Sequence, residues 1–578
     1  FTLAGAVAIS GLVALTLSPV MAANMLRADD VEDRGLSGLI NRVFNRIRDA
    51  YSYALSGTLN ARPAVYIVWL VISLCTVPMY MFSPKELAPT EDQSVLFGII
   101  NTAANATAEQ NKVYADATEK AMLETPEALL TFQFLFPPSI GATLGADGFS
   151  GLAVKPWSER ERTVAEILPE VQAKLSGIPG IQMFVTTPPA LPGGSNFPVE
   201  FVITSTGDSA QLLELAQQIQ GKAAQSGLFF FPPIIDMKFD QPQATIRIDR
   251  DKVASLGLNL AQIGADLSVA MGGNYVNRFN MDGRSYKVIP QLQRSDRLTS
   301  DQLENLHIQA PDGRMIPLSA VASIENSVVP RSLNRFQQLN AVKLSGMSAR
   351  TLDESLAFLE KTAAEILPPG YSYDYTGESR QLRTEGNKFL PAFSLAVLLI
   401  FLALSVQFNS FRDPLVILAG SVPLAMFGAL VFTVLKMPDP STPSWTNGWT
   451  TTMNIYAEVG LVTLVGLIAK NGILIVEFAN KLQEQGLGKL EAAHEAATTR
   501  LRPVLMTSIA TIAGHFPLVL VTGAGASARN SIGLVLVGGM AIGTLFTLFV
   551  VPSIYVLMAR DHRQLKQEEE RRAAMEPA

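Results

Sequence analysis

The chain is poor in the residues that build disulfides, metal sites and charged surfaces. Of its 578 residues only Cys75 is a cysteine, which excludes an intrachain disulfide framework and any zinc site made of several cysteines. The four histidines, at positions 307, 494, 515 and 562, are scattered and form no metal-ligand spacing. Charged residues make up 17% of the chain, and the net charge of −6 argues against a nucleic-acid partner. The composition is also unlike that of collagen-like, coiled-coil or disordered proteins.

What the chain has in excess is apolar sequence. Hydrophobic residues make up 48% of it, and its long uncharged runs indicate a membrane protein. A membrane-spanning helix needs about 20 mostly apolar residues. Seven segments are predicted to span: residues 3–25, 64–82, 389–408, 415–435, 455–478, 504–522 and 532–558. The first could instead be a signal peptide, but it lacks a positively charged start and begins at Phe1, so we expect a span that is preceded by further sequence.

The connections between these segments predict the orientation. Basic residues gather in residues 27–62, 409–414 and 479–503 and after residue 558, which all fall on one side if the spans alternate. Because basic loops stay in the cytoplasm, the stretch 83–388 is expected outside it, which is the periplasm in a bacterium with two membranes. Within residues 27–62, apolar side chains at helical spacing predict an amphipathic helix on the inner leaflet, or else a soluble linker helix.

Strands alternate with helices in the external region, from about residue 93 to 377. Four amphipathic helices with flanking strands predict two split βαβ, ferredoxin-like units. The expected helices are residues 108–123, 159–175, 209–225 and 352–367, and the expected strands are residues 95–101, 129–136, 182–187, 199–204, 229–239, 341–345 and 372–376. An insertion at residues 241–325 has expected strands at 245–248 and 284–292 and a helix at 260–270. The sequence contains no phosphate-cradling loop, nucleophile elbow or metal-binding helix, so we expect neither an enzyme nor a cofactor.

One lysine stands deep inside a predicted span. Lys470 lies about 16 Å from the cytoplasmic end of its segment at ~1.5 Å per residue, a distance over which its side chain is not expected to reach water. A charge buried there costs roughly 2.5–3.5 kcal/mol and needs a carboxylate partner or a wet cavity. Glu477 lies nearer the cytoplasm, and the spans offer no aspartate at mid-depth. We therefore expect the partner outside this chain.

A second span should bring a hydroxyl to the same depth. Thr507 lies on the helical face of Arg500, about 10 Å along the next span, which matches the depth of Lys470. A lysine whose carboxylate partners take up and release protons is the chemistry of a proton relay. The alternative is a structural lysine held by backbone carbonyls.

Two segments near the C-terminus carry a family resemblance. Residues 469–479, AKNGILIVEFA, followed by residues 500–508, RLRPVLMTS, closely resemble the resistance-nodulation-division superfamily, and in particular its hydrophobe/amphiphile multidrug efflux pumps. Further matches are LSP at 17–19, GGNYVN at 272–277, YDYTG at 373–377 and TGAG at 522–525. The resemblance covers essentially the whole chain. It implies a transporter of twelve spans in two similar halves, with this chain similar to the C-terminal half from the sixth span onward.

The resemblance also implies a division of the chain. It gives a span (1–26), a cytoplasmic loop with an interfacial amphipathic helix (27–62), a second span (63–83), a first porter subdomain (84–190), a second porter subdomain in two parts (191–240 and 326–386), a docking subdomain (241–325), five spans (387–560) and a cytoplasmic tail (561–578).

By the same resemblance, the expected function is proton-driven efflux of amphiphilic compounds by the inner-membrane pump of a tripartite system. Lys470, Arg500 and Thr507 match the relay positions, and their partners are two adjacent aspartates on the fourth span, outside this chain. The implied partners are a homotrimer of the pump, a periplasmic adaptor protein and an outer-membrane channel protein. Protons and small amphiphiles are the transported species, and no cofactor or metal is implied.

Phenylalanines line the substrate clefts of this family. Phe132, Phe134 and Phe136 precede an expected mobile loop from Pro137, and Phe184 falls at a matching strand position. Aromatic walls suit bulky amphiphiles, whereas the alternative is that each phenylalanine is strand core. The chain departs from the family pattern at Thr186, Pro188 and Gly193, in a loop after Phe136 richer in Pro and Gly, and in a long linker at 437–452.

Two other functions within the superfamily stay open. A heavy-metal exporter would need three clustered methionines, and the external region offers Met122, Met183, Met237 and Met347 without grouping them in sequence. A protein-secretion accessory would have a smaller external domain and fewer spans.

Overall fold

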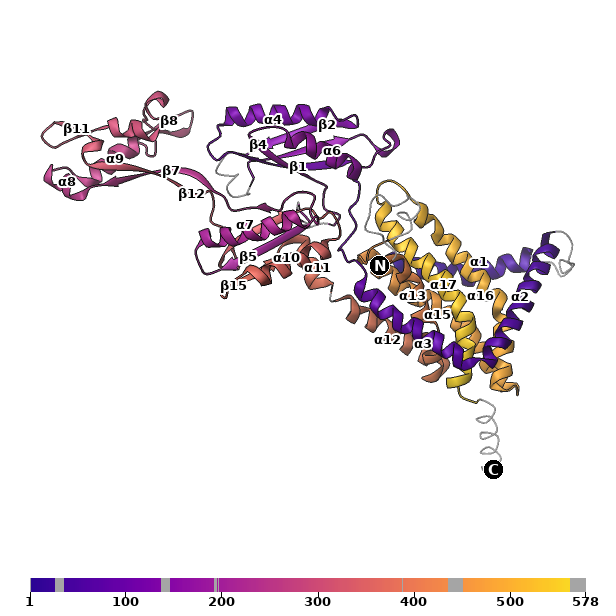
Figure 1. Cartoon of the computed structure of the whole chain (residues 1–578). Helices are drawn as coiled ribbons and strands as arrows, with labels where there is room; N and C mark the ends of the chain where they lie inside the picture. Colours follow the sequence, from indigo (N-terminus) through magenta and orange to yellow (C-terminus); the bar gives the residue numbers. More distant parts are fainter. Residues whose placement is uncertain are drawn as a thin grey trace. The chain divides into compact units, whose positions relative to one another are not determined.

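The computed structural model describes residues 2–25, 36–136, 146–191, 195, 197–386, 388–434 and 451–561 (Figure 1). The chain divides into two compact units. The helical unit comprises residues 1–89 and 385–578, and the mixed unit comprises residues 90–384. The predicted loop from Pro137, Gly193, most of the linker 437–452 and nearly all of the tail 561–578 lie outside the described residues.

Long helices make up the described part of the helical unit. They are α1 (Thr2–Met25), α2 (Leu36–Asn60), α3 (Arg62–Phe82), α12 (Phe389–Phe408), α13 (Arg412–Val434), α15 (Ile455–Glu484), α16 (Lys489–Leu520) and α17 (Ala526–Met558). Within the described ranges, six are long and apolar enough to cross a membrane, namely α3, α12, α13, α15, α16 and α17. The apolar part of α1 is shorter, Ala8–Asn24, so a seventh span stays a prediction.

Three helices form the centre of this unit. Between 56% and 67% of the apolar stretches of α13, α15 and α17 is buried, against 6–17% for α3, α12 and α16. Close approach is possible because glycines face each other: a Cβ built on Gly428 of α13 would lie 2.9 Å from the Gly538 carbonyl oxygen of α17. Small residues that let backbones approach are how helices pack in lipid, where no hydrophobic effect drives them together.

Helix α16 begins earlier than the predicted span 504–522. Its first turns, from Lys489, bury Ala492, Ala493 and Ala496 against the bundle. These alanines form a helix by propensity and packing, but the segment is too polar to resemble a span. The apolar pattern therefore marks only the second part of a continuous helix of 32 residues.

The first sheet of the mixed unit has the strand order β2-β3-β1-β4, with every pair antiparallel. Its elements follow in the chain as β1 (Val95–Thr102), α4 (Ala108–Leu123), β2 (Ala128–Leu135), β3 (Gly148–Val154), α6 (Val164–Ser176) and β4 (Ile181–Thr186). This is the chain order of a split βαβ unit. Strand β3 was not expected, because Gly148, Ser150 and Gly151 give it little strand propensity. Pairing with β1 and β2 on both sides compensates.

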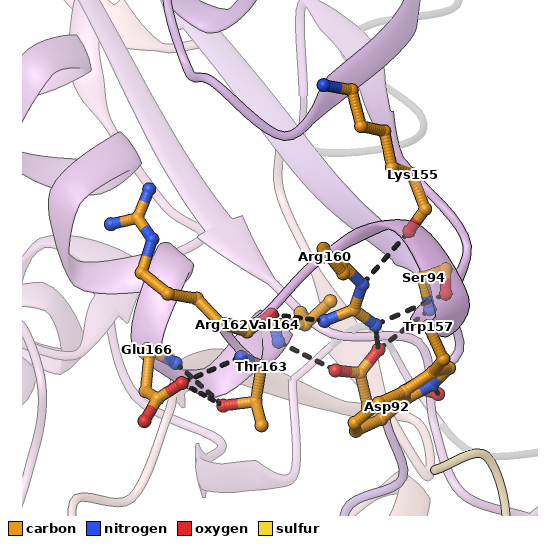
Figure 2. Close-up of polar contacts among 9 residues, drawn as sticks. All are labelled: Asp92, Ser94, Lys155, Trp157, Arg160, Arg162, Thr163, Val164 and Glu166. Atoms are coloured by element: carbon orange, nitrogen blue, oxygen red, sulfur yellow. Dashed lines mark hydrogen bonds and ion pairs between the residues drawn. The ribbon is translucent and has the colours of Figure 1, made fainter.

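The start of α6 corrects the predicted helix 159–175. The Arg160 side chain is fully buried and donates to the Asp92 carboxylate at 2.6 Å, while its guanidinium stacks over Trp157 at 4.4 Å (Figure 2). The other Asp92 oxygen accepts the backbone N–H of Val164 at 2.7 Å, and a Thr163–Glu166 capping box closes the terminus. The helix therefore begins at Val164, because the preceding segment is needed to bury Arg160.

The second sheet has the strand order β13-β14-β5-β15, with β6 added beside β14. Its elements are β5 (Val199–Ser205), α7 (Ser209–Gln225), β6 (Ile234–Ile235), β13 (Arg335–Phe336), β14 (Leu339–Gly346), α10 (Leu352–Ile366) and β15 (Tyr371–Tyr375), and α11 (Gly377–Glu385) follows. The predicted strand 229–239 was wrong over most of its length. Pro232 and Pro233 lack backbone N–H groups, which restricts the pairing strand to Ile234–Ile235.

A long two-stranded ribbon leads to the inserted module (Figure 1). Strand β7 (Phe239–Ile248) pairs with β12 (Ala322–Pro330). The module contains α8 (Arg250–Ser255), α9 (Leu260–Ala270), the hairpin β8 (Asn277–Met281) with β9 (Arg284–Val288), and the pair β10 (His307–Gln309) with β11 (Met315–Pro317). The ribbon starts six residues before the predicted strand 245–248, and β9 ends four residues before the predicted 292. Ile263, Ile308 and Val321 form the small core of the module.

Candidate functional site

Lys470 is held by a hydroxyl on the neighbouring helix. Its half-buried side chain on α15 donates from Nζ to Thr511 Oγ1 of α16 at 3.0 Å. Thr511 lies one helical turn beyond Thr507, the hydroxyl that the sequence indicated. Thr507 is exposed and donates to the carbonyl of Val504 in its own helix at 3.2 Å. The structure thus brings Lys470 to Thr511, and a relay role for Thr507 stays a prediction.

No carboxylate reaches Lys470 within the described part of the chain. Glu477, two turns away on α15, pairs instead with Lys481 at 2.8 Å. An ammonium has three N–H donors, and the described residues provide an acceptor for one of them. Lys470 therefore has the capacity to bind further acceptors.

Arg500 lies near the start of the apolar part of α16 and does not contact Lys470 among the described residues. Its guanidinium stacks over Phe478 at 4.4 Å. Its Nε is buried, with no hydrogen-bond partner in the ranges that the structure covers. Seven residues separate Arg500 from Thr507, about 10 Å along the helix. The predicted trio is therefore spread along the bundle and does not form one cluster.

A polar network that the sequence did not single out adjoins Lys470. Asn471 Nδ2 donates to Ser508 Oγ of α16 at 3.1 Å and to Thr544 Oγ1 of α17 at 3.2 Å. Thr544 donates to Ser508 at 3.2 Å, and all three side chains are buried. An asparagine inside an apolar run was the available signal, because buried amides need partners. The network ties α15, α16 and α17 together beside the lysine.

Phenylalanines share one face of the first sheet. In the strand register Phe184 lies opposite Ile99, Ile99 opposite Phe149, and Phe149 opposite Phe134. Phe97 and Phe132 both lie opposite Gly151. Because directly opposite residues point to the same side of a sheet, these residues form a single phenylalanine face. The face consists of Phe97, Phe132, Phe134, Phe149 and Phe184.

The phenylalanine face is not the core of this sheet. Helices α4 and α6 pack on the other side, against alternate residues such as Leu96, Leu152 and Met183. Phe134 is 58% exposed, and the Phe132, Phe97 and Phe149 side chains are half-buried. The rings of Phe97 and Phe149 lie 5.1 Å apart. Phe149 was missed because the strand Gly148–Val154 was not expected, and Phe97 was missed because that strand is what joins β1 to β2.

The rings of Phe97, Phe132, Phe134 and Phe149 contact one another, and two of the predicted phenylalanines lie away from them. Phe184 is on β4, at the opposite edge of the sheet from β2, and its ring contacts that of Phe231 at 5.1 Å. Phe136 is half-buried just past the end of β2 and donates its backbone N–H to the Asp147 carbonyl at 2.8 Å. Three of the four predicted residues are therefore on one sheet and Phe136 follows one of its strands, but the four do not all touch.

A cleft of about 560 Å³ opens at the end of the first sheet. It is lined by Asn101, Thr102, Ala103, Gly180, Ile181, Gln182, Lys238, Asp240 and Arg331. By strand alternation, Asn101 and Gln182 point to the same side as the phenylalanine face. Burial, and next the charge of Arg331, lower the pKa of Lys238, whose ammonium makes no hydrogen bond within the described ranges. The cleft thus adds a polar end to an aromatic surface.

Arg331 joins the ribbon to the first sheet in this cleft. Its guanidinium makes two bonds to the Asp240 carboxylate, at 2.6 and 2.7 Å. It also donates to the Thr102 carbonyl at 2.9 Å and to Asp147 at 3.3 Å. Asp147 accepts the Thr102 backbone N–H at 2.7 Å as well. One side chain therefore bridges the start and end of the ribbon and the edge of the first sheet.

Replacing Arg331 by leucine is expected to destabilise the mixed unit by about 2 kcal/mol, because Asp147 and Asp240 lose a cation that is largely shielded from water. Limited proteolysis and thermal unfolding of the purified protein measure this loss. Arg247→Leu is the matched control, since its pair with Glu325 on the same ribbon is exposed and should change stability by less than about 0.5 kcal/mol. Equal stability of the two variants would contradict the expectation.

The external methionines are core side chains. Met122, Met183 and Met347 are buried in the core of the first sheet, and Met237 is buried in that of the second. Buried thioethers packed among aliphatic residues fill space. Their positions give no support to a heavy-metal cleft.

Comparison with known proteins gives a consistent set of relatives. The model of the AcrB/AcrD/AcrF family matches residues 1–559. An uncharacterized transporter of Haemophilus influenzae is 37% identical over 98% of this chain and 54% of its own length. The toluene efflux pump membrane transporter TtgB of Pseudomonas putida is 32% identical over 96% of the chain and 53% of its own length. The multidrug export protein AcrF of Escherichia coli is 30% identical over 97% of the chain and 54% of its own length. The chain thus spans about half the length of the curated relatives it matches.

Proposed function

This chain belongs to the AcrB/AcrD/AcrF family, and from that premise we propose that it is the C-terminal half of a proton-driven efflux transporter for amphiphilic compounds. Relatives that carry the names of solvent and multidrug efflux proteins support the direction of transport. The observation that carries the proposal is Lys470, an ammonium in a membrane-capable helix whose contact in the described ranges is one neutral hydroxyl. A group so placed needs a carboxylate that it can bind and release.

The proposed cycle exchanges the partners of Lys470. Two aspartates of the other half, on the fourth span of the full transporter, pair with the ammonium while they are ionised. A proton that enters from outside neutralises a carboxylate, and the ion pair with Lys470 is lost. Arg500 and Thr507 are proposed to serve the same relay by family resemblance. The change in helix contacts then shifts the transporter between conformations that open to opposite sides.

The phenylalanine face supports the substrate class. It offers Phe132, Phe134 and Phe184, together with the added Phe97 and Phe149, on the side of the sheet opposite to α4 and α6. Aromatic rings without a dense set of hydrogen-bond donors bind bulky apolar groups without strict selection. We place amphiphile binding on this face, with Phe136 at its margin.

The proposed setting is the inner membrane of a bacterium. The mixed unit lies in the periplasm, where residues 84–190 form one porter subdomain, residues 191–240 and 326–386 the other, and residues 241–325 the docking subdomain. The helical unit provides up to seven spans, with α1 as the seventh, and α2 lies on the inner leaflet. The full pump is a homotrimer that works with an adaptor protein and an outer-membrane channel protein.

Transport by the complete protein should require a proton gradient. Proteoliposomes with an acidic periplasmic side are loaded with a fluorescent amphiphilic dye. Export of the dye is expected to fall at least about tenfold when a protonophore is added, because the carboxylates that pair with Lys470 are then no longer protonated from one side only. The membrane potential is clamped separately, so that only the proton gradient changes. Export that continues unchanged after the gradient has collapsed would exclude proton coupling.

A further inference from the structure

Lys470 has one contact that needs no carboxylate, and its neighbours fix where that contact lies. Asn471, the next residue on α15, is fully buried and bonds to Ser508 on α16 and Thr544 on α17. These bonds fix the backbone of α15 beside the lysine. The flexible part at this position is therefore the four-carbon side chain of Lys470.

Thr511 is oriented to accept the ammonium. Its hydroxyl donates a hydrogen bond to the Thr507 carbonyl at 2.7 Å, one turn back on α16. A hydroxyl has one donor and two lone pairs, so the Thr511 oxygen presents only lone pairs to Lys470. The Thr511 backbone carbonyl in turn is bound by His515 Nδ1 at 2.7 Å. The position of Thr511 is thus set by its own helix on both sides.

Thr507 has the same type of side chain but a different surrounding. Its hydroxyl donates to the Val504 carbonyl, and its side chain is exposed in the described structure. No described contact joins it to Lys470. Two threonines one turn apart on α16 therefore differ in a single respect that matters here, which is contact with the ammonium.

We propose that Thr511 is the positioning residue that holds Lys470 in its carboxylate-free state. The inference rests on the proposed proton-driven function. A proton binds a carboxylate, which loses its negative charge, and the Lys470 ammonium keeps its own proton and moves to Thr511 Oγ1. When the carboxylate releases its proton, the ammonium returns to it. Because a neutral hydroxyl binds an ammonium more weakly than a carboxylate does, the exchange is reversible.

Thr511→Val in the complete transporter tests this role, since valine keeps the shape and removes the hydroxyl. Export of the dye at neutral pH is expected to fall about tenfold, the loss of one hydrogen bond to a charged group. The external pH that gives half-maximal export should move about one unit toward acid, because a tenfold weaker Thr511-bound state needs about tenfold more protons to populate it. Thr511→Ser, which keeps a hydroxyl, should restore both values.

Three further variants make the outcome decisive. Thr463→Val on α15 is the matched control, because its hydroxyl bonds the carbonyl of Val459 in its own helix and should leave both values unchanged. The inference is wrong if export by Thr511→Val is normal at every pH, or if it is reduced at every pH without a shift. It is also wrong if the pH of half-maximal export shifts less in Thr511→Val than in Thr507→Val. Lys470→Ala distinguishes a failure of the Thr511 role from a failure of the proposed function. If it loses export while Thr511→Val is normal, only the role of Thr511 fails, whereas export that survives in Lys470→Ala removes the proposed function itself.

Discussion

Lys470→Ala in the complete transporter is expected to lower export by about a hundredfold or more, with unchanged amounts of protein in the membrane. In the proposed relay, alanine leaves the carboxylates of the other half without a cation inside the bilayer, and removing one partner of a buried charge pair costs about 3–5 kcal/mol. The carboxylates would then hold their protons permanently, and the cycle would stop in one conformation. Dye export from cells and drug susceptibility measure the effect, with the amount of protein determined by immunoblot.

Lys481→Ala provides the control on the same helix. Lys481 lies eleven residues further along α15, and its side chain is 56% exposed in a pair with Glu477. Such an exposed pair contributes roughly 0–1 kcal/mol, so export should stay near normal. Drug resistance in Lys470→Ala cells that equals resistance in Lys481→Ala cells would contradict the relay.

Gly428→Val is expected to destabilise the helical unit by about 3 kcal/mol. A Cβ at Gly428 would lie 2.7 Å from the Ile542 Cβ and 2.9 Å from the Gly538 carbonyl oxygen, both on α17. The carbonyl belongs to the backbone, so relief requires α13 and α17 to separate along the most extensively buried part of the bundle. Overpacking of this kind costs typically 1–3 kcal/mol, and here several contacts are lost together. Thermal unfolding in detergent and the yield of monodisperse protein report the loss.

Gly57→Val makes the same substitution where space is available. Nothing lies within 4 Å of a Cβ at Gly57 of α2, so the change should alter stability by less than about 0.5 kcal/mol. If both variants unfold at the same temperature, the contact between Gly428 and Gly538 does not limit the packing of the bundle.

Much of the secondary structure could be predicted because it follows from local patterns. The helix expected at 209–225 matches α7 residue for residue, and 389–408 matches α12. Errors arose where tertiary contacts overrode the local pattern. Arg160 moved the start of α6 by requiring burial against Asp92, and β3 formed from a glycine-rich segment because two strands pair with it.

The phenylalanine face shows the same limit for the site. Phe132 and Phe134 are close in sequence, and alternation on one strand was enough to group them. Phe97 and Phe149 join them through the register of three antiparallel strands, which depends on contacts between residues up to about 60 positions apart. Lys238 and Arg331 reach the neighbouring cleft from a ribbon more than 80 residues downstream of β3. No local pattern carries that information.

The sequence alone determined that this protein has long apolar helices, that one of them contains a lysine, and that its motifs match a family of transporters, because hydrophobicity and motif identity are properties of neighbouring residues. The tertiary structure decided that Lys470 meets Thr511 and not Thr507, and that Asn471 is tied to Ser508 and Thr544. The rotation and offset of one helix against another follow from how glycines and side chains interlock along the whole contact. A difference of one turn, about 5.4 Å, therefore lies beyond what spacing along a single helix can specify.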